Sequence, residues 1–125
     1  MTTKKLYSAD LSPYSASVRM QIYAKGSTDI AFELPDRWSM PKFCERFPIR
    51  HDPILDIDGD PKPKCELIAE YVAEIYPEPS LLGPTPRESA HIRMLARIGD
   101  SLIMNNMFKR RASRSTSGFL GRLLC

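Results

Sequence analysis

Hydrophobic and polar positions follow two different spacings along the chain, and each spacing predicts an element. A short segment of strand formers, Lys4–Ser8, is followed by Ser12 and Pro13, a pair of residues that favours a helix start. From there to about Lys25, apolar residues recur every four positions, which is typical of a helix with one buried face. The pattern then predicts a strand over Ile30–Leu34, where every second residue is strongly apolar.

Further along, the pattern predicts a short helix, a strand hairpin and a longer helix. We expect the short helix around Lys42–Arg46, in a segment that prolines interrupt on both sides. Pro53–Ile57 is typical of a strand, and the pair Asp58-Gly59 favours a tight hairpin turn after it. The returning strand contains two prolines and must lie at a sheet edge, because proline has no N–H to donate to a neighbouring strand. One apolar face then predicts a helix over about Cys65–Tyr76.

The second half of the chain predicts a domain boundary. Prolines concentrate between residues 77 and 86, which indicates a linker, and an amphipathic helix should run from near Pro86 to about Phe108. Residues 109–125 are rich in Arg and Ser without periodicity, which favours a disordered basic tail. We therefore predict an α/β domain with a mixed sheet over residues 1–80, in the order β-α-β-α-β-β-α, a linker and helix over 81–108, and the tail over 109–125.

Composition and charge exclude several kinds of protein. The 125 residues are 42% hydrophobic, which is enough to build a buried core. No segment approaches the ~18 apolar residues of a membrane span, and the N-terminus lacks the apolar stretch of a secretory signal. The net charge of +3 comes from the tail, which holds five basic residues, no acidic residue and one aromatic residue, Phe119. Single-stranded nucleic-acid sites use more aromatic side chains than this, so we expect neither a membrane nor a nucleic-acid partner.

The cysteines and histidines form no metal-binding pattern. Cys44, Cys65 and Cys125 are widely spaced and odd in number, and His51 and His91 lie far apart. These spacings favour reduced cysteines, a cytoplasmic location and no metal.

Three parts of the chain, taken in their order, resemble the glutathione S-transferase superfamily. Leu6–Ser8 with Ser12–Arg19 is similar to the first strand, the catalytic turn and the first helix of that family. Pro53–Gly59 is similar to its proline-valine-leucine strand and hairpin. Cys65–Val72 with Tyr76–Leu82 is similar to its third helix and interdomain linker.

The resemblance covers about residues 4–108 and has consequences for fold and function. The stretch Arg93–Met107 resembles the opening helix of the family's all-helical second domain. The resemblance implies a thioredoxin-like first domain followed by a truncated all-helical segment, because family members continue for ~100 further residues of helices. It also implies glutathione as the co-substrate and a small electrophilic molecule as the second substrate. Whether the protein forms a homodimer is left open by the resemblance.

The family's chemistry requires a group that stabilises the thiolate of glutathione, because free thiols of this kind have a pKa of ~8.5. Ser12, directly before Pro13 at the helix start, matches the serine of the serine-type classes, and the resemblance implies that it donates a hydrogen bond to the sulfur. Tyr7 is the alternative, because other classes use a tyrosine at the end of the first strand, and Ser15 is a third candidate. Apart from the resemblance, Ser12 would be a helix cap and Tyr7 a strand residue.

The turn before the third strand matches a glutathione-binding turn of the family. Pro53 aligns with the family's cis-proline, and the backbone of the residue before it pairs with the cysteinyl part of glutathione. That residue is Asp52, where the family usually has an apolar one, and a carboxylate beside a thiolate is unfavourable unless it points to solvent. His51 stands where some classes hold a lysine or arginine near the glycine carboxylate, or it is a surface histidine.

The main departure from the family is the pair Lys64-Cys65 at the cap of the third helix. The family usually has Glu-Ser there, which binds the γ-glutamyl amine and carboxylate. Lys64 reverses the charge that meets the amine, and Cys65 is a poorer cap and donor than serine. Losing a charge-assisted hydrogen bond costs ~1.5–3 kcal/mol, so we predict glutathione binding weakened by about tenfold or more. Cys65 is either an inert replacement for serine, which we favour, or a reactive thiol activated by Lys64.

The resemblance, together with the departures from it, implies one of two functions. The first is a cytoplasmic glutathione transferase of the detoxifying kind, with activity weakened by Lys64 and Cys65. The alternative is a transferase-like module without catalysis, which serves protein contacts or regulation. The Ser12-Pro13 pair favours the enzyme, whereas Lys64 and Cys65 favour the module.

Overall fold

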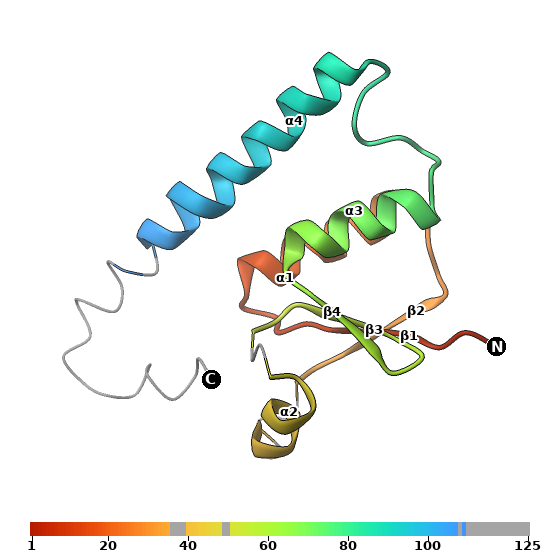
Figure 1. Ribbon diagram of the computed structural model, residues 1–125, viewed down its shortest axis with the longest axis vertical. Helices are drawn as coiled ribbons and strands as arrows, with labels where there is room; N and C mark the ends of the chain where they lie inside the picture. The colour runs from red at the N-terminus through yellow and green to blue at the C-terminus, as the bar shows by residue number, and fades with distance from the viewer. Residues whose placement is uncertain (36–39, 49–50, 108, 110–125) are drawn as a thin grey trace. The chain divides into compact units, whose positions relative to one another are not determined.

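The computed structural model describes residues 1–35, 40–48, 51–107 and 109, and most of the expected basic tail therefore lies outside the described residues. The chain divides between Pro79 and Ser80 into two compact units. The elements of the first unit are β1 (Lys4–Tyr7), α1 (Pro13–Ala24), β2 (Ile30–Glu33), α2 (Met40–Arg46), β3 (Ile54–Ile57), β4 (Asp60–Pro63) and α3 (Cys65–Ile75) (Figure 1). This order confirms the predicted β-α-β-α-β-β-α arrangement.

The strands form one mixed sheet with the order β2-β1-β3-β4. β1 pairs in parallel with β2 and antiparallel with β3, and β3 pairs antiparallel with β4. The β3–β4 turn consists of Asp58 and Gly59, with φ angles of 51° and 88°, as the sequence predicts for a tight hairpin. β4 lies at the edge of the sheet, which confirms the expectation from its two prolines. The predicted thioredoxin-like sheet is therefore present.

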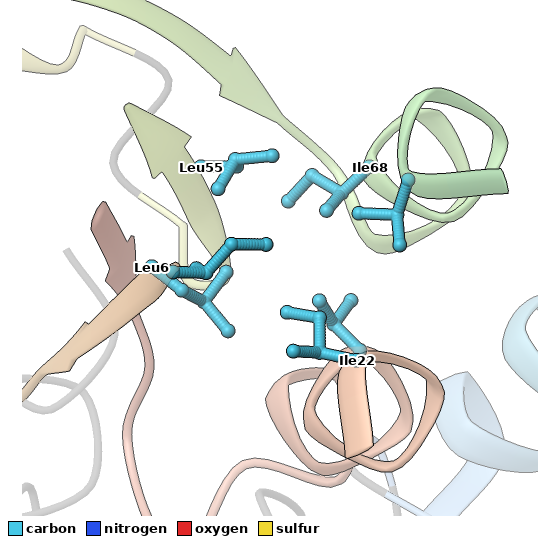
Figure 2. Close-up of a cluster of buried hydrophobic side chains, with 7 residues drawn as sticks. Leu6, Ile22, Leu55 and Ile68 are labelled. Carbon is cyan, nitrogen blue, oxygen red and sulfur yellow. The ribbon is translucent and has the colours of Figure 1, made fainter. Parts of the chain in front are cut away.

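The main core lies between the sheet and the helices α1 and α3. Leu6 of β1, Ile22 of α1, Leu55 of β3 and Ile68 of α3 point toward one another, and none of them is exposed (Figure 2). Burying each such side chain stabilises the fold by ~1.5–3 kcal/mol. The same cluster includes Val18, Ile30 and Val72. This packing holds the starts of α1 and α3 in fixed positions on the sheet.

A second cluster lies on the other side of the sheet, where α2 packs. Successive residues of a strand point to opposite faces, so Tyr7 faces away from the core that contains Leu6. Tyr7 and Ile54 are buried with Phe47, and Phe43 packs against them. Hydrophobic side chains thus pack on both faces of the sheet.

The second unit contains α4 (Pro86–Ile98), which continues as a π-helical segment over Gly99–Met104. Thr85 caps α4, because its hydroxyl oxygen accepts the Glu88 N–H at 3.3 Å. The sequence predicts one uninterrupted helix to about Phe108, and the change to π-helical geometry coincides with Gly99, the weakest helix former of the stretch. No helix in the described part of the chain is long and apolar enough to cross a membrane.

Candidate functional site

The sheet register brings four segments of the chain together at one end of the strands, which is the edge described here. Tyr7, the last residue of β1, lies opposite Ile54, the first residue of β3. Ile54 in turn lies opposite Pro63, the last residue of β4. The loop after β1, the turn before β3 and the start of α3 after β4 therefore lie together, and α1 begins at the end of the same loop.

Two helix N-termini contribute to this edge. α1 begins at Pro13, after its N-cap Ser12, and α3 begins at Cys65, after its N-cap Lys64. The N-terminus of a helix carries a partial positive charge of about half a unit and presents N–H groups without intrahelical partners. The edge can therefore stabilise a bound anion.

Ser12 occupies the N-cap of α1, where the sequence predicts it. Its backbone is extended, with φ −83° and ψ 117°, and its hydroxyl oxygen accepts the N–H of Ser15 at 3.3 Å. Its own N–H donates to the carbonyl of Ala9 at 3.2 Å. A serine oxygen that accepts one hydrogen bond still has its own proton to donate. The Ser12 hydroxyl can therefore cap the helix and donate to a ligand at the same time.

Asp52 joins the turn before β3 to the loop before α1. One of its carboxylate oxygens, Oδ2, accepts the Ser15 hydroxyl at 2.6 Å and the Ala9 N–H at 3.2 Å. One carboxylate oxygen is thus directed at α1 and its loop, while the Asp52 side chain as a whole is half-buried. The peptide bond between Asp52 and Pro53 is cis, as the resemblance implies, and Pro53 is fully buried.

Arg19 is a contributor that the sequence analysis missed. Its guanidinium donates to the Ser8 hydroxyl at 2.5 Å and to the Ala9 carbonyl at 3.3 Å, and it lies 3.8 Å from the Asp10 carboxylate. The loop after β1 is therefore held by a cation as well as by Asp52. The spacing of Ser12, Ser15 and Arg19 along one face of α1 could have indicated this, because residues three and four apart are neighbours on a helix.

Tyr7 lies in the cluster beside α2. Its ring packs against the rings of Phe43 and Phe47, with centroids 5.5 and 5.2 Å away, and it is only 8% exposed. Its hydroxyl oxygen accepts from the Arg46 guanidinium at 3.5 Å. Tyr7 therefore lies on the sheet face opposite the one that α1 covers.

Lys64 and Cys65 lie next to the cis-proline turn, because they directly follow the last residue of β4. Lys64, not Cys65, occupies the N-cap, since the helix begins at Cys65. The φ of Lys64 is 74°, a left-handed value that is uncommon for residues with a side chain, and its side chain makes no capping hydrogen bond. Cys65 is half-buried and packs against the main core.

His51 is the remaining residue that the resemblance places in the site. His51 is exposed, and no hydrogen bond or ion pair joins it to another described residue. Among the described residues, no group of three or more His, Cys, Asp or Glu side chains is placed to hold a metal ion. The structure therefore joins Ser12, Ser15 and Asp52 by hydrogen bonds and places Lys64 next to the Asp52–Pro53 turn. His51 makes no hydrogen bond or ion pair to these side chains.

Solved structures from three bacteria are among those similar to this chain. A glutathione S-transferase from Rhodospirillum rubrum F11 is 32% identical with a TM-score of 0.69, over 78% of this chain and 44% of that one. A glutathione S-transferase domain-containing protein from Marinobacter aquaeolei VT8 is 30% identical with a TM-score of 0.63, over 76% of this chain and 50% of that one. Maleylacetoacetate isomerase from Anaeromyxobacter dehalogenans 2CP-1, with dicarboxyethyl glutathione and citrate bound in its active site, is 28% identical with a TM-score of 0.64, over 80% of this chain and 49% of that one.

The similarity covers only part of each of those proteins. This chain spans about half the length of the solved structures it matches. No protein-family model matches the chain, and no curated protein matches it either.

Proposed function

The chain belongs to the glutathione S-transferase superfamily, and from this premise we propose that its first unit binds glutathione and that the protein transfers the glutathione sulfur to small electrophilic molecules. The observation that carries the proposal is the position of Ser12 at the N-terminus of α1, tied through Ser15 to the Asp52–Pro53 turn. The detoxifying role, the cytoplasmic location and a homodimer are parts of the same proposal.

In this proposal Ser12 stabilises the thiolate. The Ser12 hydroxyl donates its proton to the glutathione sulfur, and the N-terminus of α1 adds a favourable electrostatic field. A hydrogen bond to a charged acceptor contributes ~1.5–3 kcal/mol, and one pKa unit corresponds to ~1.4 kcal/mol. The pKa of the bound thiol should therefore fall by about one to two units, and the thiol proton leaves to solvent.

The chemical step that follows is nucleophilic attack. The thiolate electron pair forms a carbon–sulfur bond to the electrophile, and a pair of electrons moves to its leaving group or its acceptor atom. Ser12 takes no proton in this step, so its contribution is to hold the thiolate until attack.

The remaining glutathione contacts come from the turn before β3 and from the start of α3. The backbone of Asp52 pairs with the cysteinyl residue, as a strand would. The N-terminus of α3 and the Lys64 ammonium attract the γ-glutamyl carboxylate. Lys64 cannot accept from the γ-glutamyl ammonium, so the pose loses one charge-assisted hydrogen bond. His51 would meet the glycine carboxylate as a cation only when protonated.

A module without catalysis is the second candidate function. The observation that favours it is Lys64, an exposed cation with a left-handed backbone at the N-cap of α3. There the resemblance implies a carboxylate that meets the ammonium of glutathione. A chain that cannot hold glutathione well could still present its helices to a protein partner.

A pair of measurements on the full chain tests these functions. Reduced glutathione is titrated into the protein by calorimetry, and conjugation is followed with an aromatic electrophile whose thioether absorbs light. Millimolar binding with measurable turnover supports the transferase with a weakened site. Binding without turnover supports the module, and micromolar binding contradicts the weakening expected from Lys64. The absence of any binding at ~10 mM glutathione would overturn the proposed enzyme, because a Kd of ~1 mM leaves the site mostly occupied at that concentration.

A further inference from the structure

A closed ring of four hydrogen bonds passes through Ser12. The Ala9 N–H donates to the Asp52 carboxylate at 3.2 Å, and the Ser12 N–H donates to the Ala9 carbonyl at 3.2 Å. The Ser15 N–H donates to the Ser12 hydroxyl oxygen at 3.3 Å. The Ser15 hydroxyl donates to the same Asp52 oxygen at 2.6 Å and closes the ring.

We propose that Asp52 and Ser15 are positioning residues, which together hold the Ser12 hydroxyl in place for thiolate stabilisation. This inference rests on the proposed function. We assign both side chains to holding the loop, because Oδ2 of Asp52 is occupied by two donors and the Ser15 hydroxyl proton is given to that oxygen. Their effect reaches the ligand through Ser12.

The two residues require one another in this fold. Ser15 is fully buried, and a buried hydroxyl needs a hydrogen-bond partner. An apolar residue at position 52 would leave the Ser15 hydroxyl and the Ala9 N–H without their acceptor. The family usually has an apolar residue where this chain has Asp52. The Asp52 carboxylate is therefore accompanied by Ser15, in the first turn of α1, whose hydroxyl donates to it.

The ring controls the part of the loop that carries Ser12. Ala9 is held on one side by Asp52 and on the other by the Arg19 guanidinium, and its carbonyl also accepts the Ser12 N–H. If Asp52 is removed, Ala9 loses one of these anchors and Ser12 loses the indirect link to the turn before β3. A catalytic hydroxyl must be held within about half an ångström of its productive position, so this loss should appear in the rate.

The test compares Asp52→Val, Asp52→Asn, Ser15→Ala and the double variant Asp52→Val/Ser15→Ala in the full chain. Asp58→Asn is the matched control, because the Asp58 carboxylate also accepts one backbone N–H, that of Thr3 at 2.7 Å, but lies in the β3–β4 turn. We expect Asp52→Val and Ser15→Ala each to lower kcat about tenfold. Asp52→Asn should keep part of the rate, because its amide oxygen still accepts the Ala9 N–H.

The double variant and the control separate positioning from general stability. Both single changes open the same ring, so the double variant should lose no more rate than the worse single one. The control should keep the wild-type kcat. Wild-type kcat in Asp52→Val and Ser15→Ala, or rate losses that multiply in the double variant, would overturn the proposal.

Amide hydrogen exchange without glutathione distinguishes failure of this inference from failure of the proposed function. The Ala9 and Ser12 amides should exchange about tenfold faster in Asp52→Val than in the wild type, because the Ala9 N–H loses its acceptor and the ring opens. If the wild type neither binds nor conjugates glutathione, the proposed function fails, and the exchange rates alone decide whether the ring holds the loop. Unchanged exchange at both amides would overturn the ring itself.

Discussion

The hydroxyl of Ser15 donates to the carboxylate of Asp52 at 2.6 Å, although the two residues are 37 positions apart in the chain. This hydrogen bond joins the first turn of α1 to the residue before the cis-proline. It gives the unusual carboxylate at position 52 a structural partner, and it places Ser12 inside a connected network. The predictions below test the parts of this site and the stability of the unit that carries it.

Replacing Ser12 should lower turnover far more than it lowers stability. Ser12→Ala removes the hydrogen bond to the thiolate, and we expect kcat to fall about 10- to 100-fold, as a loss of ~1.5–3 kcal/mol requires. The lost helix cap should also lower the free energy of unfolding by about 1 kcal/mol. Ser12→Thr keeps a hydroxyl and should recover part of the rate. Kinetics with reduced glutathione and urea unfolding measure both quantities.

Ser17→Ala is the control for Ser12. The Ser17 hydroxyl is exposed on the same helix and donates to the Tyr14 carbonyl at 2.7 Å. We expect wild-type kcat in this variant. Equal losses in Ser12→Ala and Ser17→Ala would show that α1 and not the Ser12 hydroxyl determines the rate.

Tyr7→Phe tests the alternative hydroxyl. The Tyr7 hydroxyl lies beside Arg46 on the face covered by α2, so its removal should leave kcat within about twofold of the wild type. The ring remains in its cluster with Phe43 and Phe47, so the fold should be retained. A tenfold loss of kcat, with unchanged unfolding, would assign thiolate stabilisation to Tyr7 in place of Ser12.

Restoring a carboxylate at the N-cap of α3 should strengthen glutathione binding. In Lys64→Glu the new side chain can accept from the γ-glutamyl ammonium, and we expect the Kd to fall about tenfold. Lys42→Glu makes the same charge change at an exposed position of α2 and should leave the Kd unchanged. Calorimetric titration measures both. An equal or higher Kd in Lys64→Glu would mean that the ammonium of glutathione does not bind at this cap.

Glycine at position 64 should stabilise the unit. The φ of Lys64 is 74°, and a left-handed backbone costs ~1–2 kcal/mol for a residue with a Cβ atom. Lys64→Gly removes this strain but makes the unfolded chain more flexible, so we expect a net gain of about 0.5–1 kcal/mol in urea unfolding. Lys62→Gly in β4 is the control and should destabilise by a similar amount. Destabilisation by Lys64→Gly would mean that its side chain makes a compensating contact.

A polar cluster distant from the site makes stability depend on pH. The Lys4 ammonium lies 2.5 Å from the Asp29 carboxylate, and the Tyr76 hydroxyl accepts from Lys4 and donates to Asp29. Hydrogen bonds from Lys4 first, then from Tyr76, hold the pKa of Asp29 well below its usual range. Hydrogen bonds to Asp29 first, then to Tyr76, raise the pKa of Lys4 above its usual range.

The signs of these shifts define the expected pH profile. The Asp29 contribution is fully present above the unfolded pKa of ~3.9 and is lost as the pH falls below it. The Lys4 contribution is present below the unfolded pKa of ~10.4 and is lost as the pH rises above it. Because the Asp29 side chain is 52% exposed, solvent screens the pair, and Asp29→Asn should cost only about 0.5–1 kcal/mol at pH 7.

Thermal unfolding at pH 7 and pH 2 checks this profile. The difference between the wild type and Asp29→Asn should shrink at pH 2, because the Asp29 carboxyl of the unfolded chain is protonated there and must lose its proton on folding. Glu74→Gln, at an exposed position of α3, is the control and should change stability little at either pH. A difference between wild type and Asp29→Asn that is the same at both pH values would contradict the ionic origin of the contribution.

Much of the first unit could be predicted from local patterns. The start of α1 at Ser12-Pro13, the tight turn at Asp58-Gly59 and the edge position of β4 all appear in the structure. Each depends on residues a few positions apart, or on a single proline, and such preferences act through the adjacent backbone. The π-helical segment Gly99–Met104 was not predicted, because its apolar spacing also suits an ordinary α-helix.

The candidate site divides in the same way. The sequence by itself determined that Ser12 would cap a helix, that Pro53 would open a strand and that Lys64 would depart from the family at the start of α3. Only the tertiary structure decided where the Asp52 carboxylate points, that it meets Ser15 and Ala9, and that Tyr7 faces α2. These contacts join residues about 40 positions apart, and they exist because the strand register brings the ends of β1, β3 and β4 to one edge. Neither a local spacing nor a hydrophobic pattern carries that information.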